Sequence, residues 1–217
     1  MSTRANILGF LGIEAYDLIL YLTKLLYHLE KKVLLIDNSE SGALTCCIPV
    51  PDTLNPRTTK ISCTLMDFIK ERNVLEYQEE YDYILIDFGF QTNHKELDNC
   101  SVLYLITDRQ QHNITRLQNL KSGREMHVII KDIVNGRFSG YLQDCLKDKG
   151  LNIIKCYPLF KDDMDKENML GLQYSPKIKL KILSGQFRYV LNQLITETLC
   201  FSRAEAVEAY RKAKRGA

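Results

Sequence analysis

Short apolar runs of strand length alternate along this chain with longer segments in which apolar residues recur at helical spacing. This alternation is the βαβ pattern, which predicts an α/β fold with a mostly parallel central sheet flanked by helices. The predicted strands cover residues 6–11, 32–37, 81–89, 101–107, 126–131 and 151–157. The predicted helices cover residues 14–30, 64–72, 108–120, 139–149, 162–172, 185–199 and 202–214.

Several of these segments carry specific signals. The run VLLI at 33–36 is apolar at every position, as expected for a strand buried on both faces. Five leucines between residues 18 and 29 form one apolar stripe on the first helix. Residues 38–60 contain one glycine and three prolines, which predicts a loop region with at most short regular pieces. Pro158 is expected to stop the last strand, and Ser202 with Glu205 forms a capping box at the start of the last helix.

The composition is that of a folded globular chain. Of 217 residues, 45% are hydrophobic and 26% charged, which fits one α/β domain over residues 1–200 followed by an amphipathic helix and basic tail at 201–217. The formal net charge of +2 gives no strong signal for a nucleic-acid binder. The first residues lack the pattern of a signal peptide and no apolar run is long enough to span a bilayer, so we expect a cytoplasmic location.

No metal or redox site is indicated by the sequence. Seven cysteines are scattered without a C-x-x-C pair, which favours buried thiols in a reducing compartment. The acidic run at 162–167 lacks the spacing of a calcium loop and is expected to begin a helix. The four histidines show no partner pattern of a catalytic triad.

Three sequence pieces follow one another in a specific order. They are E-K-K-V-L-L-I-D at 30–37, Y-D-Y-I-L-I-D at 81–87 and Y-S-P at 174–176 before a helix. Over nearly the whole chain this order resembles the ParA/MinD family of deviant Walker ATPases. The stretch TLMDFIKERNVLE at 64–76 is similar to the short helix that follows the second strand in that family. The resemblance implies a P-loop NTPase-like, three-layer α/β sandwich.

The phosphate-binding loop of this family reads K-G-G-x-G-K-T-T, and it aligns without a gap to FLGIEAYD at 10–17, directly after Gly9. Gly12 is the one position that matches. Phe10 stands where the family has the deviant lysine that reaches a partner subunit's nucleotide. Ala15 replaces the phosphate-binding lysine, and Tyr16 replaces the hydroxyl residue that binds magnesium. The loop therefore resembles a degenerate Walker A motif.

The substitutions also change the electrostatics of the loop. A P-loop holds phosphates because glycines let backbone N–H groups curl around them while a lysine supplies positive charge. No lysine lies between Arg4 and Lys24, so a shift of register does not restore the motif. Glu14 and Asp17 fall in the predicted first turn of the helix, where their charge would oppose a phosphate with no lysine to offset it. We expect a pseudo-ATPase with no catalytic residue, no bound metal and no nucleotide cofactor.

Two aspartates at strand ends still match the family. Asp37 resembles the aspartate that acts on the attacking water, although the second aspartate of that motif is Ser39 here. Asp87 resembles the Walker B aspartate that helps to position magnesium, but FGF at 88–90 replaces the usual T-P-P. The adenine-contacting asparagine corresponds to Lys131-Asp132. We interpret Asp37 and Asp87 as retained structural caps of their strands.

These observations lead to two main hypotheses. The first is a non-catalytic scaffold or localisation protein that acts through protein partners in bacterial pilus assembly, secretion or subcellular positioning. It would be either a monomer or a homodimer with a contact that needs no nucleotide. The alternative is an atypical ATPase or switch in which Asp37 and Asp87 hold ATP with magnesium. A DNA-positioning factor is a weaker third hypothesis. The C-terminal helix has mostly alanines on its apolar side, which favours a solvated or partner-docking tail over a membrane anchor.

Overall fold

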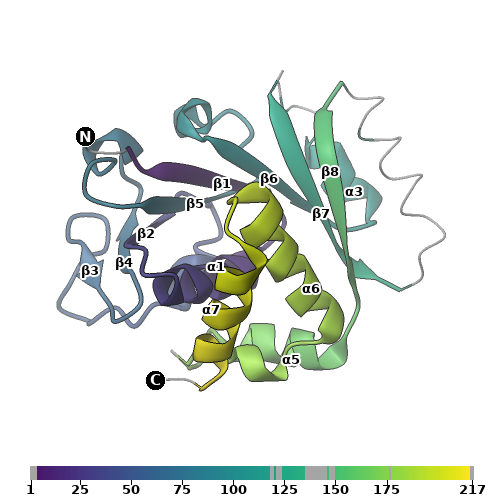
Figure 1. Ribbon diagram of the computed structural model, residues 1–217. Coiled ribbons are helices and arrows are strands. Elements are labelled where there is room, and N and C mark those ends of the chain that lie inside the picture. The colour runs from purple at the N-terminus through teal and green to yellow at the C-terminus, as the bar shows by residue number, and fades with distance from the viewer. Residues whose placement is uncertain are drawn as a thin grey trace.

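The computed structural model describes residues 4–117, 120, 124–134, 146, 150–175 and 177–215 (Figure 1). The strands are β1 (Asn6–Gly12), β2 (Val33–Asp37), β3 (Ile61–Ser62), β4 (Asp67–Lys70), β5 (Tyr83–Gly89), β6 (Val102–Thr107), β7 (Glu125–Ile133) and β8 (Asn152–Phe160). The α-helices are α1 (Tyr16–His28), α2 (Ala43–Cys46), α3 (Gln111–Arg116), α5 (Asp163–Gly171), α6 (Gly185–Gln193) and α7 (Arg203–Arg215). Short 3₁₀ turns are η1 (Val74–Glu76), η2 (Lys95–Asn99) and η5 (Leu180–Ile182), and a π-helical turn, η6 (Leu194–Thr198), extends α6.

The strands form one sheet in the order β3-β4-β2-β5-β1-β6-β7-β8. Every neighbouring pair in this order is parallel except β3 with β4. The central strands β2 and β5 are apolar along nearly their whole length and buried on both faces, as parallel strands between helices must be. The predicted α/β fold with a mostly parallel sheet is confirmed.

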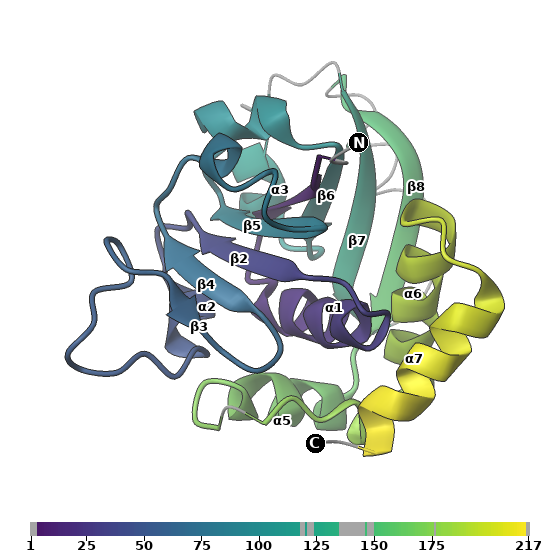
Figure 2. The same cartoon turned by 60° about the vertical axis from the view of Figure 1, so that its left-hand side comes forward.

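Two hydrophobic cores lie on opposite faces of the sheet and define three layers. On one face, α1 and α6 pack against the strands and α7 packs against α1, as Figure 2 shows from the side. On the other face, residues of α3, η1 and η2 cover the alternate side chains of the same strands. The period-two alternation of each strand thus supplies both cores.

Helix α1 is buried around its whole circumference rather than along a single stripe. Every residue from 16 to 26 is buried, because the sheet covers one side of the helix while α6 and α7 cover others. The leucine stripe is evident in the sequence, whereas the second covering layer follows only from the positions of α6 and α7. Two charged residues of α1, Asp17 and Lys24, are consequently buried, and each needs a partner.

The predicted helix at 64–72 is wrong, and with it the proposed match to a short helix of the ParA/MinD family. This segment contains β4, which pairs with β2 and forms a short antiparallel ladder with β3. Phe68 belongs to the core on the α1 face and its neighbour Ile69 to the core on the opposite face. Adjacent residues on opposite faces are a property of strands, so burial on both sides outweighs the local helical spacing.

The expected stop at Pro158 is also wrong. β8 continues through this proline to Phe160, with Pro158 aligned to Ile130 of β7. A proline fits there because β8 is the last strand in the described sheet, where a missing N–H removes no ladder bond on the outer side. The predicted helix at 139–149 lies almost entirely outside the described residues.

The C-terminal helix has the predicted capping box. The Ser202 N–H donates to Glu205 Oε2 at 2.8 Å, and the Glu205 N–H donates to Ser202 Oγ at 3.2 Å. The alanines at 206, 209 and 213 are buried against the core that contains α1, and the Tyr210 hydroxyl donates to the Leu180 carbonyl at 2.8 Å. Within the described part of the chain, no helix is long and apolar enough to cross a membrane.

Candidate functional site

The candidate site is the edge of the sheet where the parallel strands end, which is where ligands bind in open α/β sheets. β1 runs to Gly12 and α1 begins at Tyr16, so three residues connect them. Gly12 has φ of 125°, and a Cβ there would lie 1.9 Å from the Ile106 carbonyl oxygen. The next N–H, that of Ile13, donates to the same oxygen at 3.0 Å. The matching glycine is thus required by close packing against β6.

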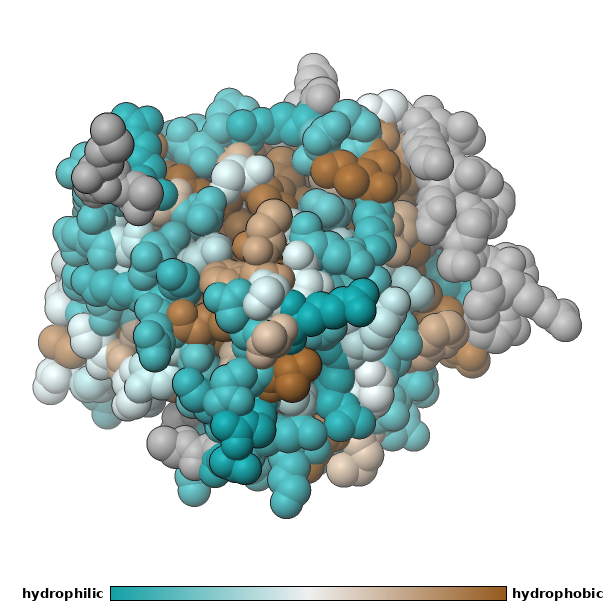
Figure 3. All heavy atoms as spheres, viewed as in Figure 1, coloured by the Kyte–Doolittle hydropathy of each residue, from teal (hydrophilic) through white to brown (hydrophobic). Residues whose placement is uncertain are grey.

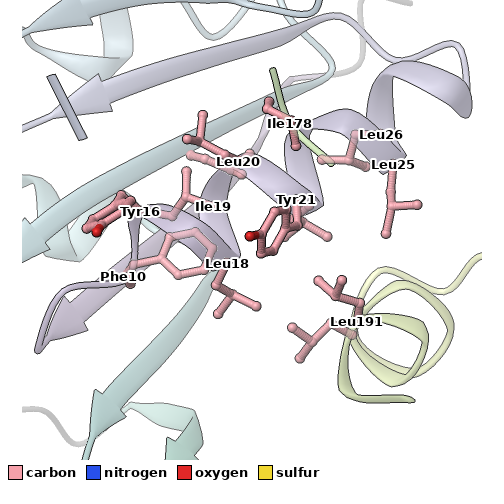
Figure 4. Close-up of a cluster of buried hydrophobic side chains, with 14 of the residues drawn as sticks. Phe10, Tyr16, Leu18, Ile19, Leu20, Tyr21, Leu25, Leu26, Ile178 and Leu191 are labelled. Carbon is pink, nitrogen blue, oxygen red and sulfur yellow. The ribbon is translucent and has the colours of Figure 1, made fainter. Parts of the chain in front are cut away.

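Three side chains assigned to the degenerate loop, those of Phe10, Ala15 and Tyr16, lie in the core. Phe10 is fully buried and stacks on Tyr104, with ring centroids 5.1 Å apart. Ala15 and Tyr16 are buried as well, and Figure 4 shows Phe10 and Tyr16 within the cluster around α1. Burial, followed by the charge of Asp17, raises the pKa of Tyr16. These residues therefore offer a ligand neither a positive charge nor an accessible oxygen atom that could bind a metal ion.

Gly9 lies inside β1 and not in the connection. A Cβ at this position would meet Cys100 Sγ and Leu103 Cδ2, each at 2.8 Å. The glycine lets β1 pack closely against the side chains on the face opposite α1. Its role is structural and is separate from the edge of the sheet.

Asp17 is paired with a lysine that the sequence analysis did not connect to it. Lys131, on β7, places Nζ 2.9 Å and 3.0 Å from the two carboxylate oxygens of Asp17. The same Nζ donates to the Glu14 carbonyl at 3.2 Å, and both side chains are buried. The expectation that no lysine offsets these acids is therefore corrected for Asp17. Glu14 precedes the helix and is exposed, so it is not in the first turn as expected.

Asp37 is fully buried and organises the chain after β2. Its carboxylate accepts hydrogen bonds from the N–H and hydroxyl of Ser39, at 3.0 Å and 2.6 Å, and from the N–H of Thr45 at 2.9 Å. The Thr45 hydroxyl donates to it as well. Two donors from Ser39 and two from Thr45 thus hold the Asp37 carboxylate, which fixes the turn after β2 and the start of α2.

Asp87 lies opposite Asp37 in the register of β5 and β2 but is less well satisfied. Oδ1 accepts the Gly89 N–H at 2.9 Å, whereas Oδ2 is buried without a partner among the described residues. Both polar side-chain atoms of neighbouring Asn38 are in the same condition. Burial, the main cause, raises the pKa of Asp87 to about 7, with Asp37 adding to the effect and the Gly89 bond opposing it.

A further carboxylate, Asp108, ends β6 on the same edge. It accepts hydrogen bonds from Gln110 and from Asn113 Nδ2, and so caps the turn into α3. Asp108 was predicted to be the first residue of that helix, but α3 begins at Gln111. Its position directly after an apolar strand was the signal that marks it as a strand-end acid. Among the described residues, no three His, Cys, Asp or Glu side chains are grouped to hold a metal ion.

A triphosphate with magnesium does not fit the residues at this edge. The loop N–H of Ile13 is already bonded to β6, the position of the phosphate-binding lysine is a buried alanine, and Asp37 is saturated by local donors. Phosphate cradles instead need free N–H groups that converge on one point. The fold does bring the predicted loop residues together, but not as a phosphate site. Phe10, Ala15 and Tyr16 are part of the hydrophobic core, and Asp17 forms an ion pair with Lys131.

No family model and no curated protein matches this chain. Solved structures match along its full length. They include MinD in the MinC:MinD cell division complex of Aquifex aeolicus, with 11% identity, a TM-score of 0.55 and coverage of 98% of this chain and 97% of that one. A ParA family ATPase of Chlorobium tepidum has 15% identity, a TM-score of 0.51 and coverage of 96% and 98%. The pNOB8 ParA protein bound to nonspecific DNA has 14% identity, a TM-score of 0.50 and coverage of 98% and 100%.

These matches define the class of fold. The chain has the P-loop NTPase-like, three-layer fold of ParA and MinD proteins, with the eight-stranded sheet described above. At 11–15% identity the likeness concerns the fold alone. The activity has to be argued from the residues at the edge of the sheet.

Proposed function

We propose that this protein is a non-catalytic ParA/MinD-like scaffold or localisation protein with a degenerate Walker A loop. The observation that carries the proposal is the β1–α1 connection, in which Ala15 and Tyr16 are buried and the Ile13 N–H is bonded to β6. A nucleotide would find neither the lysine nor the open ring of N–H groups that a phosphate requires.

The ion pair between Asp17 and Lys131 supports the same conclusion. In a ParA/MinD-like fold the start of the first helix faces the phosphates, and here a buried carboxylate occupies that turn. Its lysine partner is already engaged by both carboxylate oxygens and by the Glu14 carbonyl. Binding a phosphate to Lys131 would leave Asp17 as an uncompensated buried charge, which costs about 3–5 kcal/mol.

Protein partners are the proposed targets of this scaffold. One solved neighbour, MinD, is seen with its partner MinC in a cell division complex, and this supports protein partners and a positioning role; pilus assembly and secretion are proposed as further settings for such a scaffold. Because the β1–α1 connection offers no phosphate cradle, a homodimer would need a contact that does not depend on nucleotide. Another neighbour, ParA, is bound to nonspecific DNA, so DNA is a competing target that experiment has to separate from protein partners.

Calorimetry with ATP and magnesium, together with a phosphate-release assay, tests the non-catalytic proposal. The expected result is no heat of binding at micromolar protein and no turnover. Micromolar binding that disappears in Asp87→Ala would instead establish the alternative, an atypical ATP–magnesium switch. That alternative is favoured by one feature, the buried Oδ2 of Asp87 that lacks a partner among the described residues.

The variant Ala15→Lys provides a stricter test of the loop. Restoring this lysine alone is expected to give no ATPase activity, because position 15 faces the core and the Ile13 N–H stays bonded to Ile106. The substitution also buries a long cationic side chain, so a lower free energy of unfolding is expected. Clear turnover by this variant would show that the loop can still form a phosphate cradle.

A further inference from the structure

A cavity of about 710 Å³ lies on the face of the sheet that carries α1, and neither Asp37 nor Asp87 lines it. Its walls come from the second half of α1, from residues 63–66 between β3 and β4, from residues 177–182 and from the end of α7. Figure 2 shows α5 below α1 with the end of α7 nearby, on the side of the molecule where these segments meet. The volume is in the range of about 300–1,000 Å³ typical of small-molecule sites.

The walls of this cavity are aliphatic, and the charged residues that line it are all basic. The aliphatic side chains include Leu20, Leu65, Met66, Leu172, Ile178, Leu180 and Ile182. The lysines are Lys24, Lys177, Lys179, Lys181 and Lys214, and no Asp or Glu is among the described lining residues. The whole chain has 29 basic and 27 acidic residues, so a lining whose charged residues are all basic differs from the average of the chain. Its chemistry is complementary to an amphiphile with an anionic head.

Among the lysines that line the cavity, Lys24 is buried, so an anionic head group would supply its counter-charge. Its side chain lies on α1, the residue is 5% exposed, and Nζ donates to the Ile178 carbonyl at 2.9 Å. An ammonium has three donors, and none of the ion pairs found among the described residues involves Lys24. Burial lowers the pKa of Lys24, as expected for a cation without a nearby carboxylate. On the same helix, Asp17 has its full partner in Lys131.

We propose that this cavity binds a fatty acid, with the carboxylate at Lys24 and the acyl chain along the aliphatic walls. A carboxylate there supplies the missing counter-charge of a buried ammonium, and the exposed lysines at the rim attract the anion before it enters. A nucleotide is less suitable, because the described lining offers Tyr27 as its one large aromatic ring beside the small imidazole of His28. This site is independent of the sheet edge, so it does not depend on the proposed scaffold function.

Calorimetry with dodecanoate below its micelle concentration tests the proposal, with dodecanol as the neutral probe of equal chain length. We expect dodecanoate to bind more tightly than dodecanol. Within the series decanoate, dodecanoate and tetradecanoate, affinity is expected to rise roughly threefold to fourfold per methylene group. Equal affinity of acid and alcohol would overturn the role of Lys24, and absence of binding by both would overturn the site.

Two variants and a control locate the binding. Lys24→Met keeps the length of the side chain without its charge, and is expected to weaken dodecanoate binding roughly tenfold to a hundredfold while leaving dodecanol unchanged. Leu65→Trp fills the cavity from a half-buried position and should weaken both probes. Lys95→Met removes an exposed lysine outside the cavity and should change neither. Two results together would contradict the proposal: heparin displaces dodecanoate, and Lys95→Met weakens dodecanoate binding as much as Lys24→Met does. They would mean that dodecanoate binds to a diffuse basic surface and not in the cavity.

Discussion

Gly12 is the residue at which the backbone permits no side chain. Its φ of 125° is strained for any L-residue, and a Cβ would collide with a backbone oxygen of β6 that cannot move independently of the sheet. We expect Gly12→Ala to lower the free energy of unfolding by roughly 3 kcal/mol or more, measured by urea denaturation. Gly171→Ala is the control, because a Cβ there meets no atom within 4 Å and its effect should stay within about 0.5 kcal/mol. Equal effects of the two substitutions would contradict this account of Gly12.

Asp87 makes stability depend on pH. Its pKa is raised from 3.8 to about 7 in the folded chain, so the native state holds a proton that the unfolded state has released between these values. Stability is therefore expected to fall as pH rises through this window, by roughly 2–3 kcal/mol between pH 5 and pH 8. Asp87→Asn keeps an acceptor for the Gly89 N–H but removes the titrating group. The free energy of unfolding of this variant should therefore not decrease between pH 5 and pH 8. The exposed Asp98→Asn is the control, and it should keep the pH dependence of the parent. An unchanged pH dependence in Asp87→Asn would contradict the assignment.

The residues at the sheet edge differ in how far sequence could predict them. Asp37 and Asp87 were predictable because each directly follows an apolar run within its strand, and neighbouring parallel strands end at a common edge. The partner of Asp17 was not, because Lys131 is 114 residues away and only the parallel order of β1, β6 and β7 brings it to α1. Long-range ion pairs of this kind follow from topology and not from local spacing.

At the scale of elements, burial decided where the sequence pattern was ambiguous. The strands β1, β2, β5 and β6 and the helices α1 and α7 were predicted close to their observed bounds, because their apolar periods are long and unbroken. Residues 64–72 offered a short pattern compatible with a helix, but residues 67–70 form β4, which pairs with β2 on one side and with β3 on the other. Short segments with few apolar positions take their structure from the neighbours that they cover.

Helix α7 shows how the small residues of an element set its docking. Ala209 is buried against the core around α1, whereas Val207, two residues earlier, is 64% exposed. We expect Ala209→Glu to lower the free energy of unfolding by roughly 3 kcal/mol, because it overpacks the contact and buries a charge. Val207→Glu should change it by less than about 0.5 kcal/mol. Urea denaturation followed by circular dichroism measures both. An equally small effect of both substitutions would mean that α7 is not docked in solution and is free to contact a partner or a membrane.

At the scale of the whole molecule, the surface is mixed. On the face in Figure 3, hydrophilic residues predominate and the hydrophobic ones form separate small groups. The sequence could predict this fold because local periods, strand ends and the ParA/MinD-like order of elements all agree. It could not predict the fatty-acid cavity, since Lys24, residues 63–66 and residues 177–182 meet only in three dimensions.

DNA binding is the last property that the overall charge allows us to predict. With 29 basic and 27 acidic residues, the chain has little net charge to release counterions from a duplex. We expect no saturable binding of nonspecific duplex DNA at micromolar protein and 150 mM salt, measured by fluorescence anisotropy. Any binding seen at 50 mM salt should be lost by 200 mM salt, because contacts to phosphates alone would hold the DNA. Because the lining of the cavity includes several exposed lysines and no acidic residue among those described, dodecanoate should compete with such binding, and Lys179→Glu with Lys181→Glu should abolish it. Saturable, salt-resistant binding that survives this double substitution would show a DNA surface elsewhere on the molecule and would favour a DNA-positioning role over the protein scaffold.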